Sequence, residues 1–179
     1  MRLFSRQELM ETVRNAGAGG VKCYYPLPDW RMPQLIYTDE YLPEDNLNER
    51  LLIYHPQNKT LLADEAGLYS QIIKGGVFPF FANSFLLEIA GEQESLSRAV
   101  YVALSSDRGR EKAMATVLYS DGRAVKRPLF SEGQVYGQRL VAQSEALISR
   151  EVPVLPCSWQ DGAVQMKRVE APMLSAYLK

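Results

Sequence analysis

The sequence predicts a soluble α+β domain whose main element is an antiparallel sheet built from hairpins. Two Asp-Gly turns, at residues 121–122 and 161–162, each lie between segments rich in strand-forming residues, which is a strong short-range hairpin pattern. A capping box marks a helix at the N-terminus, and helical periodicity marks a longer one near residues 132–151. We expect both helices to pack on the sheet and residues 1–179 to form a single domain.

The composition is that of an ordinary globular protein. Hydrophobic residues make up 46% and charged residues 23% of the 179-residue chain, so it can bury a core without disulfides or a structural metal. The net charge of −1 lacks the basic excess typical of nucleic-acid binders. The charge is uneven, however: residues 1–100 carry 9 Lys and Arg against 13 Asp and Glu, whereas residues 101–179 carry 11 against 8.

The sequence favours a cytoplasmic protein without a membrane partner. The first residues lack the apolar core of a signal peptide, and no apolar stretch is long enough to span a bilayer. Cys23 and Cys157 do not have the spacing of a zinc site, and we expect them to be reduced thiols. No cofactor or metal is predicted.

The first predicted helix covers residues 5–16. Ser5 and Glu8 stand three positions apart. At this spacing the side chain of each residue can accept a hydrogen bond from the backbone N–H of the other. Gly17 favours the left-handed conformation that ends many helices. A shorter helix is expected over residues 65–74.

Short strands rich in β-branched and aromatic residues are expected in the first part of the chain. They cover residues 21–27, 34–41, 50–54, 60–63, 85–90 and 98–105. The strand at 85–90 is expected to be buried, and a hairpin loop at 55–59 joins the strands on its two sides.

The first Asp-Gly turn predicts a register. A two-residue loop at Asp121-Gly122 sets two cross-strand pairs on one core-facing side of the sheet. The pairs are Leu118 with Val125 and Met114 with Leu129. Pro128 cannot donate a ladder hydrogen bond, so its strand is expected at an edge or near its own end.

The second Asp-Gly turn predicts a hairpin with one buried and one wet face. Its pairs on the buried face are Trp159 with Val164 and Cys157 with Met166. Cys157 is therefore interpreted as core packing rather than as a reactive thiol. The run of Phe78, Phe80, Phe81 and Phe85 is also expected to be core, with an exposed patch for a partner or a lipid-like ligand as the alternative.

A stretch of acidic and aromatic side chains is the strongest candidate for a binding site. Carboxylates steer a partner with a basic surface, and aromatic rings supply area that becomes buried on binding. The predicted binding residues are Trp30, Asp39, Glu40, Tyr41, Glu44 and Asp45. The alternative is an ordinary solvated loop.

No catalytic or metal-ligating residue is assigned, because the usual motifs are absent. The sequence has neither an H-E-x-x-H zinc motif nor a G-x-S-x-G nucleophile elbow. His55 is the only histidine. Pairing of His55 with Cys23, oriented by Asp64, is a minor alternative to an exposed turn residue.

The leading hypothesis is a non-enzymatic cytosolic domain that binds a partner protein, such as an immunity-type protein or an accessory protein of a mobile element. The first alternative is a small transferase or hydrolase that acts on a nucleotide-like substrate, with Asp64, Glu88 and Arg98 as candidate residues. The second alternative is nucleic-acid binding through the basic hairpin 108–127. The competing interpretation, which the interspersed acidic residues favour, is that these charges protect a sheet edge. The basic residues are Arg108, Arg110, Lys112, Arg123, Lys126 and Arg127.

Overall fold

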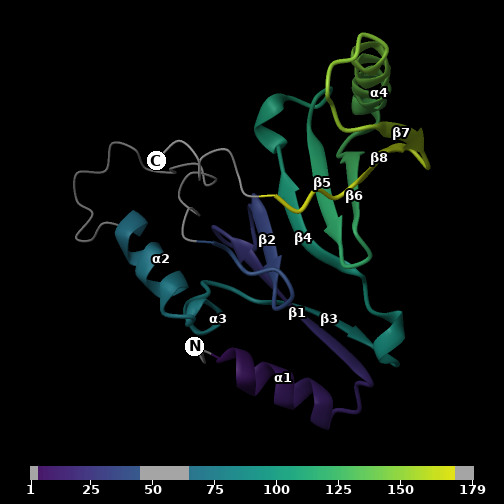
Figure 1. Cartoon of the computed structure of the whole chain (residues 1–179). Helices are drawn as coiled ribbons and strands as arrows, with labels where there is room; N and C mark the ends of the chain where they lie inside the picture. Colours follow the sequence, from purple (N-terminus) through teal and green to yellow (C-terminus); the bar gives the residue numbers. More distant parts are fainter. Residues whose placement is uncertain (1–3, 45–64, 172–179) are drawn as a thin grey trace. The chain divides into compact units, whose positions relative to one another are not determined.

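The chain folds into two compact units, residues 1–104 and residues 105–179. The structure, a computed structural model, describes residues 4–44 and 65–171. In these residues each unit contains antiparallel strands and α-helices (Figure 1). The α+β class and the antiparallel sheet are thus confirmed, whereas a single domain over the whole chain stays a prediction. The predicted hairpin at residues 50–63 lies outside the described residues.

The first unit has four strands in its described part, ordered β3-β1-β2-β4 with antiparallel pairing throughout. Its helices and strands are, in chain order, α1 (Arg6–Asn15), β1 (Gly20–Leu27), β2 (Leu35–Thr38), α2 (Glu65–Lys74), α3 (Phe78–Phe81), β3 (Leu86–Ala90), the 3-10 helix η2 (Gln93–Ser95) and β4 (Ala99–Leu104). Helix α1 packs on β1. The two predicted helices of this unit and the strands expected near β1, β2 and β4 are therefore present.

The ends of α1 form as the sequence predicts. The side chain of Ser5 accepts a hydrogen bond from the Glu8 backbone N–H, and the Glu8 carboxylate accepts one from the Ser5 N–H. At the other end Gly17 has φ of +94°, which glycine adopts without the steric cost that a side chain imposes. The N–H groups of Gly17 and Ala18 reach back to the last turn of the helix, so they satisfy carbonyls that would otherwise lack a partner.

The burial predicted for the strand at 85–90 is wrong. Strand β3 forms there, but among the strands of residues 4–44 and 65–171 it lies at the edge of the sheet and pairs with β1 alone. Leu86 and Ile89 are more than half exposed. A run of apolar residues predicts a strand, but it does not show whether a second strand or a helix covers that strand.

The second unit has four strands in its described part, ordered β5-β6-β8-β7 and antiparallel at each pairing. Its helices and strands are the 3-10 helix η3 (Ser106–Arg108), β5 (Met114–Tyr119), β6 (Arg123–Pro128), the 3-10 helix η4 (Ser131–Gly133), α4 (Gln134–Ile148), β7 (Cys157–Gln160) and β8 (Ala163–Lys167). Helix α4 packs against β6, β7 and β8. The helix predicted near residues 132–151 is therefore confirmed, together with its packing on the sheet.

The second Asp-Gly hairpin has the predicted register. Trp159 pairs with Val164 and Cys157 with Met166. Asp161 and Gly162 have φ of 52° and 70°, as a two-residue type I′ turn requires.

The register predicted for the first Asp-Gly hairpin is wrong by one residue. Leu118 pairs with Ala124, Val117 with Val125 and Met114 with Pro128. The loop holds one residue more than expected, and Gly122, with φ of 83°, donates its N–H to the Tyr119 carbonyl. This is the three-residue loop with a left-handed glycine.

A one-residue slip moves side chains to the opposite face of the sheet. Val125 therefore does not share a face with Met114 and Leu118, as it was predicted to do. Pro128 ends β6, as expected, although β6 lies between β5 and β8 rather than at an edge.

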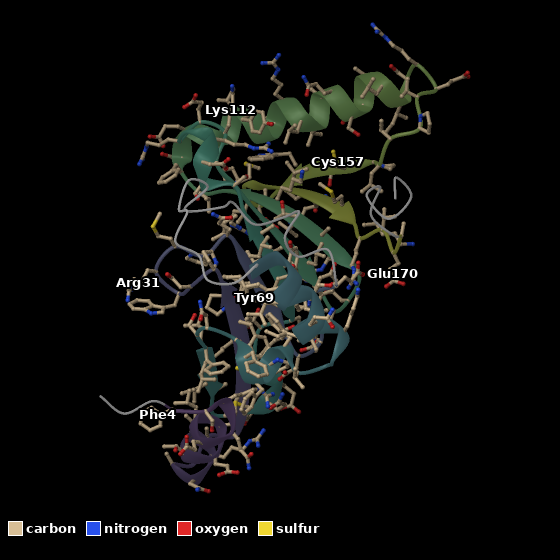
Figure 2. All side chains as sticks on the ribbon, turned by 90° about the vertical axis from the view of Figure 1, so that its left-hand side faces the viewer. Phe4, Arg31, Tyr69, Lys112, Cys157 and Glu170 are labelled. Carbon is tan, nitrogen blue, oxygen red and sulfur yellow. The ribbon has the colours of Figure 1, made fainter. Side chains whose placement is uncertain are left out.

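The contact between α4 and the sheet depends on a glycine. Gly137 faces the Trp159 ring so closely that an added Cβ would lie 2.3 Å from Cζ3. Cys157 lies on the same side of the strands as Trp159, between β7 and α4 (Figure 2). The absence of a side chain at residue 137 is what lets the helix approach the indole.

Substitution Gly137→Ala should destabilise the protein. Overpacking costs about 1–3 kcal/mol, which outweighs the roughly 1 kcal/mol that alanine gains in helix propensity. Urea unfolding measures the change. In a Trp159→Leu background, where the indole is gone, the same substitution should be neutral or stabilising, and an equal cost in both backgrounds would show that the two residues do not interact.

Candidate functional site

Five of the six predicted binding residues are described, and Asp45 lies outside the described residues. Trp30 lies in the loop between β1 and β2, whereas the other four follow β2. The structure shows that these residues have different surroundings.

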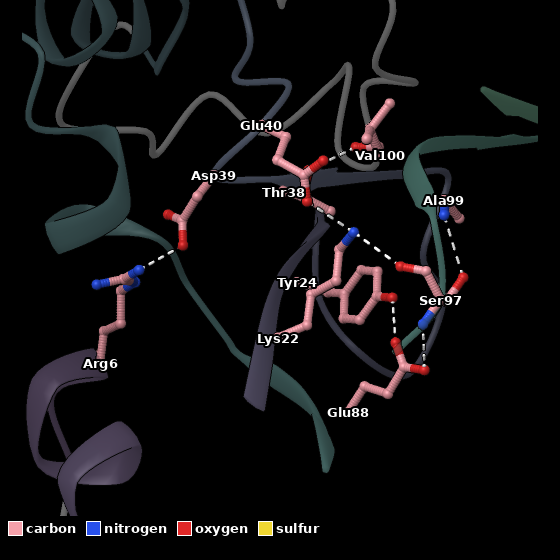
Figure 3. A network of polar contacts seen from close by, with 10 residues as sticks. All are labelled: Arg6, Lys22, Tyr24, Thr38, Asp39, Glu40, Glu88, Ser97, Ala99 and Val100. Atoms are coloured by element: carbon pink, nitrogen blue, oxygen red, sulfur yellow. Dashed lines mark hydrogen bonds and ion pairs between the residues drawn. The ribbon is translucent and has the colours of Figure 1, made fainter. Parts of the chain in front are cut away.

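The Asp39 carboxylate forms hydrogen bonds with other side chains of the protein. Its carboxylate accepts a hydrogen bond from the Arg6 guanidinium on α1 and another from the Tyr25 hydroxyl on β1 (Figure 3 shows the ion pair). Burial raises the pKa of Tyr25, and the hydrogen bond to Asp39 raises it further. Asp39 thus connects the N-terminal helix to the sheet.

Glu40 also has an internal partner. Lys22 Nζ lies 2.8 Å from Glu40 Oε1 and donates to the Ser97 carbonyl at 3.0 Å (Figure 3). The Lys22 side chain is only 10% exposed, whereas that of Glu40 is 51% exposed. Glu40 therefore neutralises a largely covered ammonium group while one side of its carboxylate faces solvent.

Tyr41 packs inward. Its ring stacks on Tyr37 with a centroid distance of 6.3 Å and lies 5.0 Å from the Tyr101 ring. Glu44, at the end of this segment, is exposed.

Trp30 is exposed on a loop with internal order. Asp29 Oδ1 accepts hydrogen bonds from the backbone N–H groups of Arg31 at 2.7 Å and Met32 at 3.3 Å, an arrangement that stabilises tight turns. Trp30 is 63% and Met32 65% exposed. Arg31, which stands between them in the sequence, projects outward (Figure 2).

The one-turn helix α3 separates its aromatic residues between core and solvent. The Phe78 ring is buried, 5.7 Å from Tyr25 and 6.2 Å from Tyr37. Phe80 and Phe81 point away from that core and are 76% and 54% exposed. The core prediction is correct for Phe78 and wrong for Phe80 and Phe81, because one turn of helix cannot direct three rings to one side.

The Trp30 loop and the α3 segment are neighbours. Asn83, just after α3, donates from Nδ2 to the Pro28 carbonyl at 3.3 Å. The two segments together expose four large apolar side chains, which we call the aromatic surface: Trp30, Met32, Phe80 and Phe81.

Two of the residues considered for catalysis are held within the fold: Glu88 by hydrogen bonds and Cys23 by burial. Both oxygens of Glu88 accept hydrogen bonds, one from the Tyr24 hydroxyl and one from the Ser97 backbone N–H (Figure 3). Cys23 is 2% exposed, and burial raises its pKa, which disfavours the reactive thiolate. Asp64 and His55 lie outside the described residues.

Two arginines of the basic hairpin form ion pairs within the protein. Arg110 Nε lies 2.8 Å from Glu132 Oε1, and its guanidinium stands 4.1 Å from the centre of the Phe130 ring. Together with a backbone N–H, this contact lowers the pKa of Glu132 to about 2. Arg123 is paired with Asp121 at 2.8 Å.

The second unit has an open hollow of about 450 Å³. Polar and charged side chains dominate its lining, and they come from β6, β7, β8 and the two turns between strands. The lining residues are Gly122, Arg123, Ser158, Gln160, Asp161, Gln165, Met166 and Lys167.

Neither a metal site nor a membrane span is found in residues 4–44 and 65–171. No three His, Cys, Asp or Glu side chains there are grouped to hold an ion. No helix in this part of the chain has the length and apolar character needed to cross a bilayer. The chain matches no protein-family model, and it has no significant match to a curated protein or to a solved structure.

Substitution Asp39→Asn should lower the free energy of unfolding by about 1–2 kcal/mol at neutral pH, because hydrogen bonds to a charged acceptor are stronger than those to an amide. Chemical denaturation measures the loss. The matched control is Glu44→Gln, which removes an exposed carboxylate nearby and should change stability by less than about 0.5 kcal/mol. Equal effects of the two substitutions would contradict a structural role for Asp39.

Substitution Arg110→Gln should raise the pKa of Glu132 from about 2 toward its ordinary value of 4.5. The reason is that the guanidinium favours the charged carboxylate. Carboxylate chemical shifts in an NMR titration report this pKa directly. Arg139→Gln, which removes a positive charge from α4 instead, should leave the Glu132 titration unchanged.

Proposed function

We propose that this chain is a non-enzymatic protein-binding protein whose first unit contacts its partner through the aromatic surface. The observation that carries the proposal is the exposure of three aromatic rings, Trp30, Phe80 and Phe81, on two neighbouring segments. Large exposed aromatic side chains are unfavourable in water and are enriched among the residues that dominate binding energy.

The rings are held in place before any partner binds. Phe78 fixes α3 to the core through its contacts with Tyr25 and Tyr37, so Phe80 and Phe81 extend from an anchored turn. Asp29 orders the loop that carries Trp30. Such preorganisation lowers the conformational entropy lost on association.

The charge of the first unit favours a partner with a basic rim. Residues 101–104 carry no charged side chain, so residues 1–104 have the same 9 basic and 13 acidic residues as residues 1–100. The exposed Glu44 and the outward side of Glu40 supply negative charge in the segment after β2. These carboxylates steer the encounter, while the aromatic surface supplies the buried area.

The immunity-type and mobile-element roles, and a cytoplasmic location, remain finer forms of the same proposal. An enzyme of the nucleotide-modifying class is less well supported. Its candidate Glu88 is occupied by internal hydrogen bonds, and Cys23 lies buried as a thiol whose pKa is raised.

The double variant Trp30→Ala/Phe80→Ala should lose a stoichiometric partner that the wild-type chain retains in a pull-down from the native host. Loss of two anchor rings typically weakens binding by 2 kcal/mol or more, about 30-fold. The retained protein is then purified and its affinity for each variant is measured by calorimetry.

The matched control is Val135→Ala/Val169→Ala, which truncates two side chains of the second unit that are 74% and 61% exposed. It should bind as the wild type does, and thermal unfolding should confirm that both double variants fold. The proposal fails if no stoichiometric partner is recovered, or if the two double variants lose it equally.

A further inference from the structure

We propose that helix α1 is a strap that opens on its own, while the sheet of the first unit stays folded, and thereby uncovers Cys23. This device is independent of the proposed function, because neither α1 nor Cys23 belongs to the aromatic surface. The observations that carry it are the small apolar contact of the helix, a buried donor in its charged contact, and the glycine that follows it.

Helix α1 covers the side of β1 that carries Cys23. Tyr25 and Cys23 point to the same face, since they stand two positions apart on one strand. Asp39 binds both the Tyr25 hydroxyl and the Arg6 guanidinium of α1, which places the helix over this face. Burial raises the pKa of the Cys23 thiol and the positive charge of Arg6 opposes that rise, as expected for a thiol close to α1.

The apolar contact that holds α1 is small. Met10 is the only side chain of the helix that is buried, and Leu9 and Val13 are half-buried. A helix of ten residues is marginal in water and depends on its packing for stability. By contrast β1 pairs on both sides and buries Tyr25 and Leu27 completely. The free energy that holds α1 on the sheet is therefore a small part of the free energy that holds the sheet together.

The charged contact of α1 contains an unsatisfied donor. Arg6 Nε is buried, and within residues 4–44 and 65–171 it has no hydrogen-bond partner. The Arg6 and Asp39 side chains are 34% and 47% exposed, so solvent screens their ion pair and limits its contribution. A buried N–H without a partner costs free energy that is regained when water reaches the group. Opening of α1 hydrates Nε, so this part of the contact favours release.

A hinge and a fixed point follow α1. Gly17 has φ of +94°, and an added Cβ there would meet no described atom within 4 Å. At Gly19 an added Cβ would lie 1.9 Å from the carbonyl oxygen of Gly91. The backbone therefore has room to turn at Gly17 and is packed in place at Gly19, so the strap ends where the helix ends.

Opening of the strap uncovers an apolar face that carries a thiol. Cross-strand pairing puts Leu87 beside Cys23 and Ile89 beside Val21 on this face. Ile89 is 56% exposed even with α1 in place, whereas Cys23 is 2% exposed. The position of α1 thus controls whether the thiol can react with a molecule in solution.

The test is labelling of the full wild-type chain with N-ethylmaleimide in increasing urea, with peptide mass spectrometry to follow Cys23 and Cys157 separately. Cys23 should react at urea concentrations at which the sheet stays folded. The urea dependence of its labelling should be less than about a third of that of global unfolding, because opening of α1 exposes little surface. Amide hydrogens of α1 should exchange at least about 10-fold faster than those of β1, relative to their intrinsic rates.

Substitution Met10→Ala removes the buried anchor of the strap and should speed the labelling of Cys23 by at least about 30-fold. The matched control is Leu35→Ala, which truncates a buried side chain of β2 at the end of that strand away from Asp39. It should lower global stability by a similar amount. Its labelling of Cys23 without urea should stay within about 2-fold of the wild-type rate, because the sheet is intact in the open state.

Two results would overturn the proposal. One is labelling of Cys23 with the free energy and urea dependence of global unfolding, since the thiol would then be reached only when the sheet unfolds. The other is equal protection of the α1 and β1 amides, or equal acceleration of labelling by Met10→Ala and Leu35→Ala. Where a variant fails to fold, labelling and amide exchange of the wild-type chain decide the question.

Discussion

The first unit depends on the burial of one tyrosine. Tyr25 is fully buried on β1, which pairs with β2 on one side and with β3 on the other. Its ring contacts Phe78 and Phe85, and its hydroxyl donates to Asp39. A buried hydroxyl without a partner costs about 1–3 kcal/mol, so the position of Asp39 follows from that of Tyr25.

The need to satisfy Tyr25 explains much of what surrounds it. The Asp39 carboxylate also pairs with Arg6 on α1. The helix is thereby fixed to the sheet by a charged contact as well as by its apolar face, which buries Met10. The same ring fixes α3 through Phe78, and that anchoring is what leaves Phe80 and Phe81 extended into solvent.

Local chemistry was readable from the sequence, and long-range pairing was not. The capping box at Ser5, the end of the first helix at Gly17 and the Asp161-Gly162 turn each depend on residues a few positions apart, and all three predictions are correct. The Gly122 turn was misread because Asp-Gly fits both a two-residue loop and a three-residue loop with a left-handed glycine. Asp39 and Arg6 stand 33 positions apart, so nothing local marks them as partners.

The candidate sites were harder to predict than the fold, for a related reason. A cluster of charges in a sequence does not show which charges are neutralised inside the folded chain. In the acidic stretch Asp39 and Glu40 have internal partners, and in the basic hairpin Arg110 has one. Sequence clusters therefore overstate the charge that is available for binding.

The side chains that the fold leaves exposed are the ones that can bind another molecule. In the first unit these are the exposed rings of Phe80 and Phe81 on α3, together with Trp30 on the loop between β1 and β2. In the second unit they are the polar and charged side chains that line the hollow, with Lys167 as an example. The groups available for binding thus differ between the two units: exposed rings on the first, and polar and charged side chains on the second.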